Sequence, residues 1–231
     1  ESDNSKPQAT MADIEDQMRN IPGMGNVEVD RSANVRLPFD AELYAPFIET
    51  EDDPESLATF YETTTNSEAQ YGAPLISVNS DMIKLYNKTA RQKIDIDAFE
   101  KGEVCLIGYV DSISASERMT DKTLTLVNDQ TGRKRQISVG VAMMRTEQSA
   151  ITAGYYWVLG GAPEAIFVSD AVMDDLFPDA EISCIIADAE KGKESEVTPY
   201  VQRIVKENPV IAGSDIKSVE GSEFKKSMLS L

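Results

Sequence analysis

Near the start of the chain, hydrophobic residues recur at intervals of three and four positions. They are Met11, Ile14, Met18 and Ile21. This spacing places the four side chains on one face of an α-helix. Thr10 carries a side chain suited to cap the first turn, Asp13 stands at the third helical position, and Pro22-Gly23 ends the helix. The pattern predicts an amphipathic helix over residues 11–21.

The next segment changes from helical spacing to strict alternation. The apolar positions are Val27, Val29, Ala33, Val35, Leu37 and Phe39. The polar residues between them are Glu28, Asp30, Ser32, Asn34 and Arg36. Because successive side chains of a β-strand point to opposite faces, this alternation predicts a strand with one face toward a core and the other toward water.

The middle of the chain alternates strand and helix patterns. Residues 73–79 and 104–110 are apolar enough for strands, and between them lie a helix capped near Ser80 and a short helical turn that Lys101-Gly102 ends. A hairpin follows, in which the sequence Asn-Asp-Gln-Thr-Gly over residues 128–132 supplies the turn. Its arms carry alternating apolar residues, which are Leu124, Leu126, Ile137, Val139 and Val141.

The last third predicts a strand, a helix, a strand, a helix and a final short strand and helix. Ser169 is placed to cap the first of these helices, and Thr198 with Pro199 is placed to open the second. Such an order packs helices on one face of a sheet. The predicted fold class is therefore α+β.

Charge narrows the classes of function. The chain of 231 residues has a net charge of −18, and residues 1–57 contribute strongly to it with 14 acidic and 4 basic residues. Nucleic acids and anionic lipid surfaces bind clustered lysine and arginine, so we expect no nucleic-acid partner. The chain also has no apolar run near the roughly 18 residues of a membrane helix.

The absence of histidine removes several kinds of catalytic and metal site. A chain without histidine cannot form a Ser-His-Asp or Cys-His arrangement or a histidine-containing zinc site. Two cysteines, Cys105 and Cys184, are too few for a four-thiolate site. Each lies in an apolar strand pattern, so we expect buried thiols, with a disulfide as the alternative in an oxidising compartment. Phosphate-binding and dinucleotide-binding glycine motifs are also missing, and no cofactor is expected.

The acidic pairs Asp95/Asp97 and Asp174/Asp175 are the candidates for carboxylate catalysis. Acids at helix starts and on solvated surfaces are the favoured interpretation. The basic run over residues 133–135 is interpreted as internal salt-bridge partners rather than a ligand site.

Two segments are candidates for contact with a partner. The acidic loop contains Glu49, Glu51, Asp52 and Asp53, and the aromatic segment contains Tyr155, Tyr156 and Trp157. Clustered carboxylates attract hard cations, but this loop lacks the spaced ligand pattern of a calcium loop, so no metal site is predicted. The aromatic side chains could form an exposed contact surface or pack in the core.

Several segments, in order, resemble one known family. They are IPGMGNVEVDRSANVRL (residues 21–37), LISVNSDMIKLYN (75–87), IDIDAFEKGEVCLI (94–107), TLTLVNDQTGRKRQISVGV (123–141), IFVSDAVMDDL (166–176), EISCIIA (181–187) and TPYVQRIVKEN (198–208). Together they resemble the MacB-like extracytoplasmic domain of bacterial ABC transporter permeases with FtsX-like membrane regions. The resemblance covers most of residues 10–230, and residues 40–72 and 145–164 fit it less well.

This resemblance implies a non-catalytic domain outside the cytoplasmic membrane, between the first two membrane helices of the permease. It implies a porter-like α/β subdomain, residues 1–72 plus 140–231, interrupted by a smaller β-rich insert, residues 73–139. The implied partners are an ABC ATPase subunit, a second permease copy, and a peptide, lipoprotein or drug substrate. The first and last helices should then end near one face.

Two alternatives remain at this stage. One is a free-standing secreted or surface-anchored module that binds a ligand or protein. The other is a hydrolase that uses carboxylates without histidine. A membrane helix encoded just before Glu1 and about three after Leu231 would favour the permease, whereas a lone signal peptide or lipobox would favour the binding module.

Overall fold

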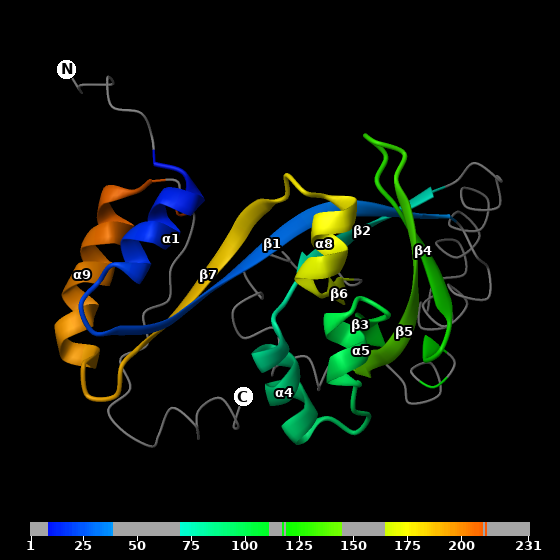
Figure 1. Ribbon diagram of the computed structural model, residues 1–231, viewed down its shortest axis with the longest axis horizontal. Coiled ribbons are helices and arrows are strands. Elements are labelled where there is room, and N and C mark those ends of the chain that lie inside the picture. The colour runs from blue at the N-terminus through cyan, green and yellow to red at the C-terminus, as the bar shows by residue number, and fades with distance from the viewer. Residues whose placement is uncertain are drawn as a thin grey trace, which may run out of the picture. The chain divides into compact units, whose positions relative to one another are not determined.

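The computed structural model describes residues 9–38, 70–110, 117, 119–144, 165–209 and 211 of the chain (Figure 1). The helices in these residues are α1 (Met11–Arg19), α4 (Ser80–Thr89), α5 (Ile96–Glu100), α8 (Asp170–Leu176) and α9 (Glu194–Glu207). The strands are β1 (Met24–Pro38), β2 (Gln70–Ser77), β3 (Val104–Val110), β4 (Thr123–Val127), β5 (Lys134–Met144), β6 (Ile166–Val168) and β7 (Glu181–Ala189).

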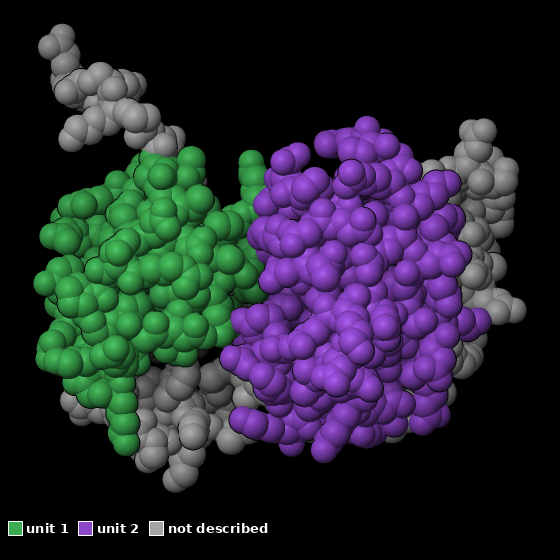
Figure 2. Space-filling model, viewed as in Figure 1, with its two compact units in different colours: residues 1–30, 181–231 green, residues 31–180 purple. Residues whose placement is uncertain are grey.

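The chain folds into two compact units (Figure 2). Unit 1 is Glu1–Asp30 with Glu181–Leu231, and unit 2 is Arg31–Ala180. The long strand β1 therefore contributes residues 24–30 to unit 1 and residues 31–38 to unit 2. The subdomain boundaries implied by the family resemblance, at residues 72/73 and 139/140, stay a prediction about functional subdomains.

The strands of unit 2 form a closed β-structure. Their order is β2-β6-β3-β5-β4-β1, and β1 pairs with β2 again to complete the circuit. The β1–β2, β3–β6 and β4–β5 pairs are antiparallel, whereas β2–β6 and β3–β5 are parallel. Parallel neighbours need a crossover segment: α4, α5 and strands β3 to β5 lie between β2 and β6, and β4 lies between β3 and β5. Closure leaves these strands without an open sheet edge.

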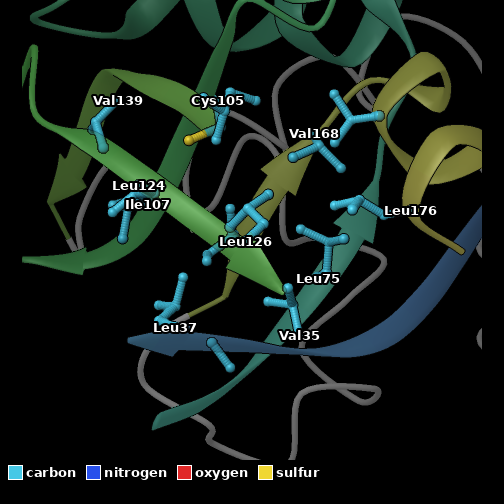
Figure 3. Packing of buried hydrophobic residues seen from close by; sticks show 14 of the residues in the cluster. Val35, Leu37, Leu75, Cys105, Ile107, Leu124, Leu126, Val139, Val168 and Leu176 are labelled. Carbon is cyan, nitrogen blue, oxygen red and sulfur yellow. The ribbon is translucent and has the colours of Figure 1, made fainter. Parts of the chain in front are cut away.

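The interior of unit 2 is filled with apolar side chains from every one of its strands. Figure 3 shows Val35, Leu37, Leu75, Cys105, Ile107, Leu124, Leu126, Val139 and Val168 pointing toward one another. Helix α8 adds Val172, Met173 and Leu176 to the same cluster. Leu75, Leu126 and Val139 have no exposed surface at all, so the interior of this β-structure is a packed core.

Unit 1 has its own core between two helices and two strands. Helix α1 contacts both α9 and β7. The buried residues are Ile14, Met18, Ile21, Val27, Val197 and Ile204, with Ile185, Ala187 and Ala189 of β7 packed against them. The helical stripe predicted for residues 11–21 thus faces this core, except that the helix itself ends at Arg19.

The mixed content of helices and strands confirms the α+β class predicted from the sequence. The strand predicted from the alternation at Val27 to Phe39 is confirmed as β1 (Met24–Pro38). The β4–β5 hairpin and the alternation of strands and helices over residues 166–207 are also confirmed. Of the short strand predicted at residues 209–213, the structure describes only Pro209 and Ile211, and neither lies in a strand. The helix predicted near Leu231 and the segments at residues 40–69 and 145–164 lie outside the described residues.

Two predicted details are wrong. Asp30 was expected on the wet face of its strand but is only 1% exposed. It lies where β1 neighbours β7, and its backbone carbonyl accepts a hydrogen bond from the Ser183 hydroxyl of that strand. Helix α9 begins at Glu194, one turn before the predicted Thr198-Pro199 start. The Thr198 hydroxyl donates to the Glu194 carbonyl at 2.7 Å, as a residue inside the helix does, and Pro199 sits in the second turn.

Candidate functional site

The seven residues predicted to contact a partner lie outside the described residues. They are Glu49, Glu51, Asp52, Asp53, Tyr155, Tyr156 and Trp157. Their role in partner contact stays a prediction, and the candidate site must be built from other side chains.

The first pair of candidate carboxylates serves a helix start. Asp95 is the N-cap of α5, and its carboxylate accepts a hydrogen bond from the Ala98 backbone N–H at 3.0 Å. Asp97 lies in the first turn, where a negative charge is favoured by the helix dipole. This is the helix-start role that the sequence favours for both residues.

The second pair of candidate carboxylates belongs to a cluster of ion pairs around α8. Arg31 of β1 forks across two turns of the helix: its Nη1 donates to Asp174 at 2.8 Å and its Nη2 donates to Asp170 at 2.9 Å. Arg135 of β5 donates to the Asp175 carboxylate at 2.8 Å, and Arg133 donates to the Asp175 carbonyl at 2.8 Å. We call these six residues the α8 ion-pair cluster.

The local sequence explains why the fork can form. Asp170 and Asp174 are four residues apart in a helix, so their side chains project from the same face. Arg31 of β1 carries two Nη groups on one guanidinium, so each can donate to a different carboxylate. The Asp-x-x-x-Asp spacing on a predicted helix indicates the two acceptors, but no signal in the sequence indicates that Arg31 is their donor.

The cluster lies between the protein interior and the solvent. The side chain of Arg31 is 18% exposed, whereas those of Asp170 and Asp174 are 57% and 65% exposed. Partial burial alone would lower the pKa of Arg31, but the hydrogen bonds and charges of Asp170 and Asp174 raise it above its ordinary value. Arg31 therefore stays charged, and the cluster acts as a structural ion-pair network.

A glycine and an asparagine fix the other side of α8. The second Nη of Arg135 donates to the carbonyl of Gly102 at 3.0 Å. Gly102 has a φ of +70°, and an added Cβ would lie 2.6 Å from both Arg135 Nη2 and Val172 Cγ2.

Asn128, buried in the β4–β5 turn, donates to the Leu176 carbonyl at 2.8 Å and accepts from the Gln130 backbone N–H. The salt-bridge role predicted for the basic run over residues 133–135 is confirmed for Arg135.

The two cysteines are thiols rather than a disulfide. Burial raises the pKa of Cys105 to about 12. Burial, together with the charge of Asp30, raises the pKa of Cys184 to about 11. Because the thiolate is the reactive form, both side chains are poor nucleophiles near neutral pH.

Within the residues that the structure describes, no group of three or more acidic or cysteine side chains is arranged to hold a metal ion. In the same part of the chain, no helix combines the length and the apolar character needed to cross a membrane.

Solved structures similar to this chain are extracytoplasmic parts of ABC transporters. The extracellular domain of the noncanonic ABC-type transporter YknZ from Gram-positive bacteria is 10% identical with a TM-score of 0.43, over 87% of this chain and 86% of that one. The periplasmic region of MacB from Actinobacillus actinomycetemcomitans is 9% identical with a TM-score of 0.42, over 89% of this chain and 79% of that one. Both come from the class of protein that the sequence resemblance names.

Neither protein-family profiles nor curated protein sequences give a match to the chain.

Proposed function

We propose that this chain is the extracytoplasmic domain of an ABC transporter permease, a non-catalytic part that relays ATP-driven motion to a substrate or partner in the cell envelope. The proposal is supported at the level of sequence by the segments between residues 21 and 208 that resemble the MacB-like domain and occur in the same order. The structural observation that carries it is that unit 1 is formed by two segments, one that precedes unit 2 in the sequence and one that follows it.

In unit 1, the first and last described helices share one core. Ile14 of α1 and Ile204 of α9 are both buried in it, although 190 positions separate them in the sequence. A domain inserted between two membrane helices must return its chain to the membrane that it left, and a unit made from both flanks of the chain suits this path. The terminal helix predicted near Leu231 lies outside the described residues.

In this proposal, ATP is hydrolysed by a separate ABC subunit, and the permease assembles as two copies. The substrate would be a peptide, a lipoprotein or a drug. The catalytic alternative finds no support in the four candidate carboxylates, because Asp95 caps a helix and Asp174 and Asp175 are ion-paired to arginines.

The location is tested in intact cells that produce the full-length protein. Ser195 is exposed on α9, so Ser195→Cys offers an accessible thiol. A membrane-impermeant maleimide should label this cysteine without lysis, and the unsubstituted protein, whose Cys105 and Cys184 are buried and half-buried, should label weakly. Labelling only after lysis would overturn the extracytoplasmic location.

The relay is tested by export measurements in the same cells. Removal of residues 31–180 should abolish export while the ABC subunit retains basal ATPase activity. Recovery of the mature protein from the culture medium, without membrane association, would instead support the free-standing binding module.

A further inference from the structure

The chain passes between its two units at two places, and side chains fix the backbone at the first of them. This first passage is at residues 30/31 of β1. The Asp30 carbonyl accepts a hydrogen bond from the Ser183 hydroxyl at 3.1 Å. The Arg31 backbone N–H donates to the Ser77 hydroxyl at 3.2 Å, and Ser77 is fully buried in β2. These two hydrogen bonds restrict movement of the β1 backbone at Asp30 and Arg31.

The second passage, at residues 180/181, follows α8 after four residues. The connection is ordered by two backbone hydrogen bonds, from Phe177 to Met173 at 2.7 Å and from Ala180 to Phe177 at 2.9 Å. Strand β7 then begins at Glu181. Four residues, 177–180, therefore join the end of α8 to the start of β7.

The Arg31 fork joins the first passage to α8 within unit 2. The side chain leaves β1 at the first residue of unit 2 and binds Asp170 and Asp174, which lie four residues apart on α8. The helix is consequently attached to both passages, by ion pairs to β1 and by the chain itself to β7.

We propose that Arg31, Asp170 and Asp174 form a latch that makes β1 and α8 move together in unit 2, and that opening this latch releases α8 from the strand. The proposal rests on the proposed function, because a relay needs elements that transmit displacement, but the latch is testable by itself.

The exposure of the two aspartates makes the latch reversible. Both carboxylates face solvent over more than half of their side-chain surface, so water competes for them and salt screens them. Helix α8 also keeps apolar contacts through Val172, Met173 and Leu176. The latch can thus open while the helix remains packed on the core.

Hydrogen–deuterium exchange of the full chain tests the latch. Arg31→Gln, and separately Asp170→Asn with Asp174→Asn, should speed amide exchange in residues 170–180 roughly three- to tenfold. Exchange in β3 and β5 should change less than about twofold. The paired aspartate variant alters only exposed side chains, so it tests the latch even where the arginine variant folds poorly.

Arg36→Gln is the matched control. Arg36 lies on the same strand and pairs with Asp129 rather than with a residue of α8, so its loss should leave exchange in residues 170–180 unchanged. Combining Arg31→Gln with the two asparagine variants should add nothing to either alone, since all remove the same interaction. High salt should speed exchange in the unsubstituted chain and not in the variants.

Unchanged exchange in α8, or a uniform rise across β3, β5 and α8, would overturn the latch. The second result would mean that the ion pairs contribute only to global stability. Neither result bears on the location of the domain, which the Ser195→Cys experiment decides without reference to Arg31.

Discussion

At the scale of single residues, Gly102 shows how one position allows a contact elsewhere. Its positive φ and the absence of a Cβ let Arg135 approach the backbone closely enough to bond the Gly102 carbonyl. Another glycine, Gly132 in the β4–β5 turn, has almost the same φ of +72° but nothing within 4 Å of an added Cβ. A side chain at either position would strain the backbone, but only a side chain at position 102 would also clash with its neighbours.

Gly102→Ala should destabilise the protein by about 2–4 kcal/mol, because left-handed backbone strain adds to a clash with Arg135 and Val172. Gly132→Ala should destabilise the protein only through backbone strain, by about 1–2 kcal/mol. Urea unfolding of both variants measures the difference. Equal losses would show that the neighbours of Gly102 move aside without cost.

The thiols should react slowly in the native protein. At pH 8, Ellman's reagent should modify half-buried Cys184 before buried Cys105, and both much more slowly than in urea, because the pKa of each is raised to about 11 and about 12 respectively. Cys105→Ala and Cys184→Ala assign the two phases. Rapid native modification of Cys105 would contradict its burial.

The raised pKa values of the two thiols also make the stability of the folded protein depend on pH. Since each folded thiol has a pKa above its unfolded value of about 8.5, its contribution to stability is complete below that pH. The contribution declines as the pH rises toward the folded values.

At the scale of elements, helix α1 begins with a capping box that the sequence predicted. The Thr10 hydroxyl accepts from the Asp13 N–H at 3.1 Å, and the Asp13 carboxylate accepts from the Thr10 N–H at 2.7 Å. The backbone hydrogen bond from Thr10, followed by the one from its side chain, lowers the pKa of Asp13. This element is thus fixed by contacts only three residues apart.

NMR titration should show Asp13 with a pKa below the ordinary value of about 3.9. Thr10→Ala should raise this pKa only in part, because the larger cause, the Thr10 backbone N–H, remains. A lowered folded pKa contributes stability that is present above about pH 4 and is lost as the pH falls through the folded value. Complete restoration of the ordinary pKa in Thr10→Ala would contradict this order of causes.

Local sequence predicted those features that local interactions decide. The Thr10 cap, the 128–132 turn and the alternation in β1 all depend on residues within a few positions. The start of α9 was missed because Thr198-Pro199 has the composition of a cap, while the chain continues the helix backward to Glu194. The burial of Asp30 and the fork of Arg31 depend on residues more than 130 positions away, and no local pattern encodes such pairings.

At the scale of the whole molecule, the local sequence pattern also could not predict that the apolar residues divide between two cores. Closure of the unit 2 sheet requires β1 to pair with β2 and β2 to lie parallel to β6, across 90 residues of sequence. The apolar residues of β1 look alike along the strand, yet Val27 belongs to the core of unit 1 and Val35 to the core of unit 2.

Separate cores predict separate responses to core substitution. Leu126→Ala in unit 2 and Ile204→Ala in unit 1 should each cost about 2–5 kcal/mol in the unit that contains them. Ile204→Ala should speed amide exchange in α1 and α9 and leave β3 and β5 protected, because the buried side chains of β3 and β5 pack in the other core.

Leu126→Ala should accelerate exchange in β3 and β5 and so locate the second cooperative unit. Exchange mass spectrometry of the full chain in low urea measures both variants on the same peptides. If Ile204→Ala accelerated β3 and β5 as much as α9, the protein would unfold as one cooperative body rather than as two units.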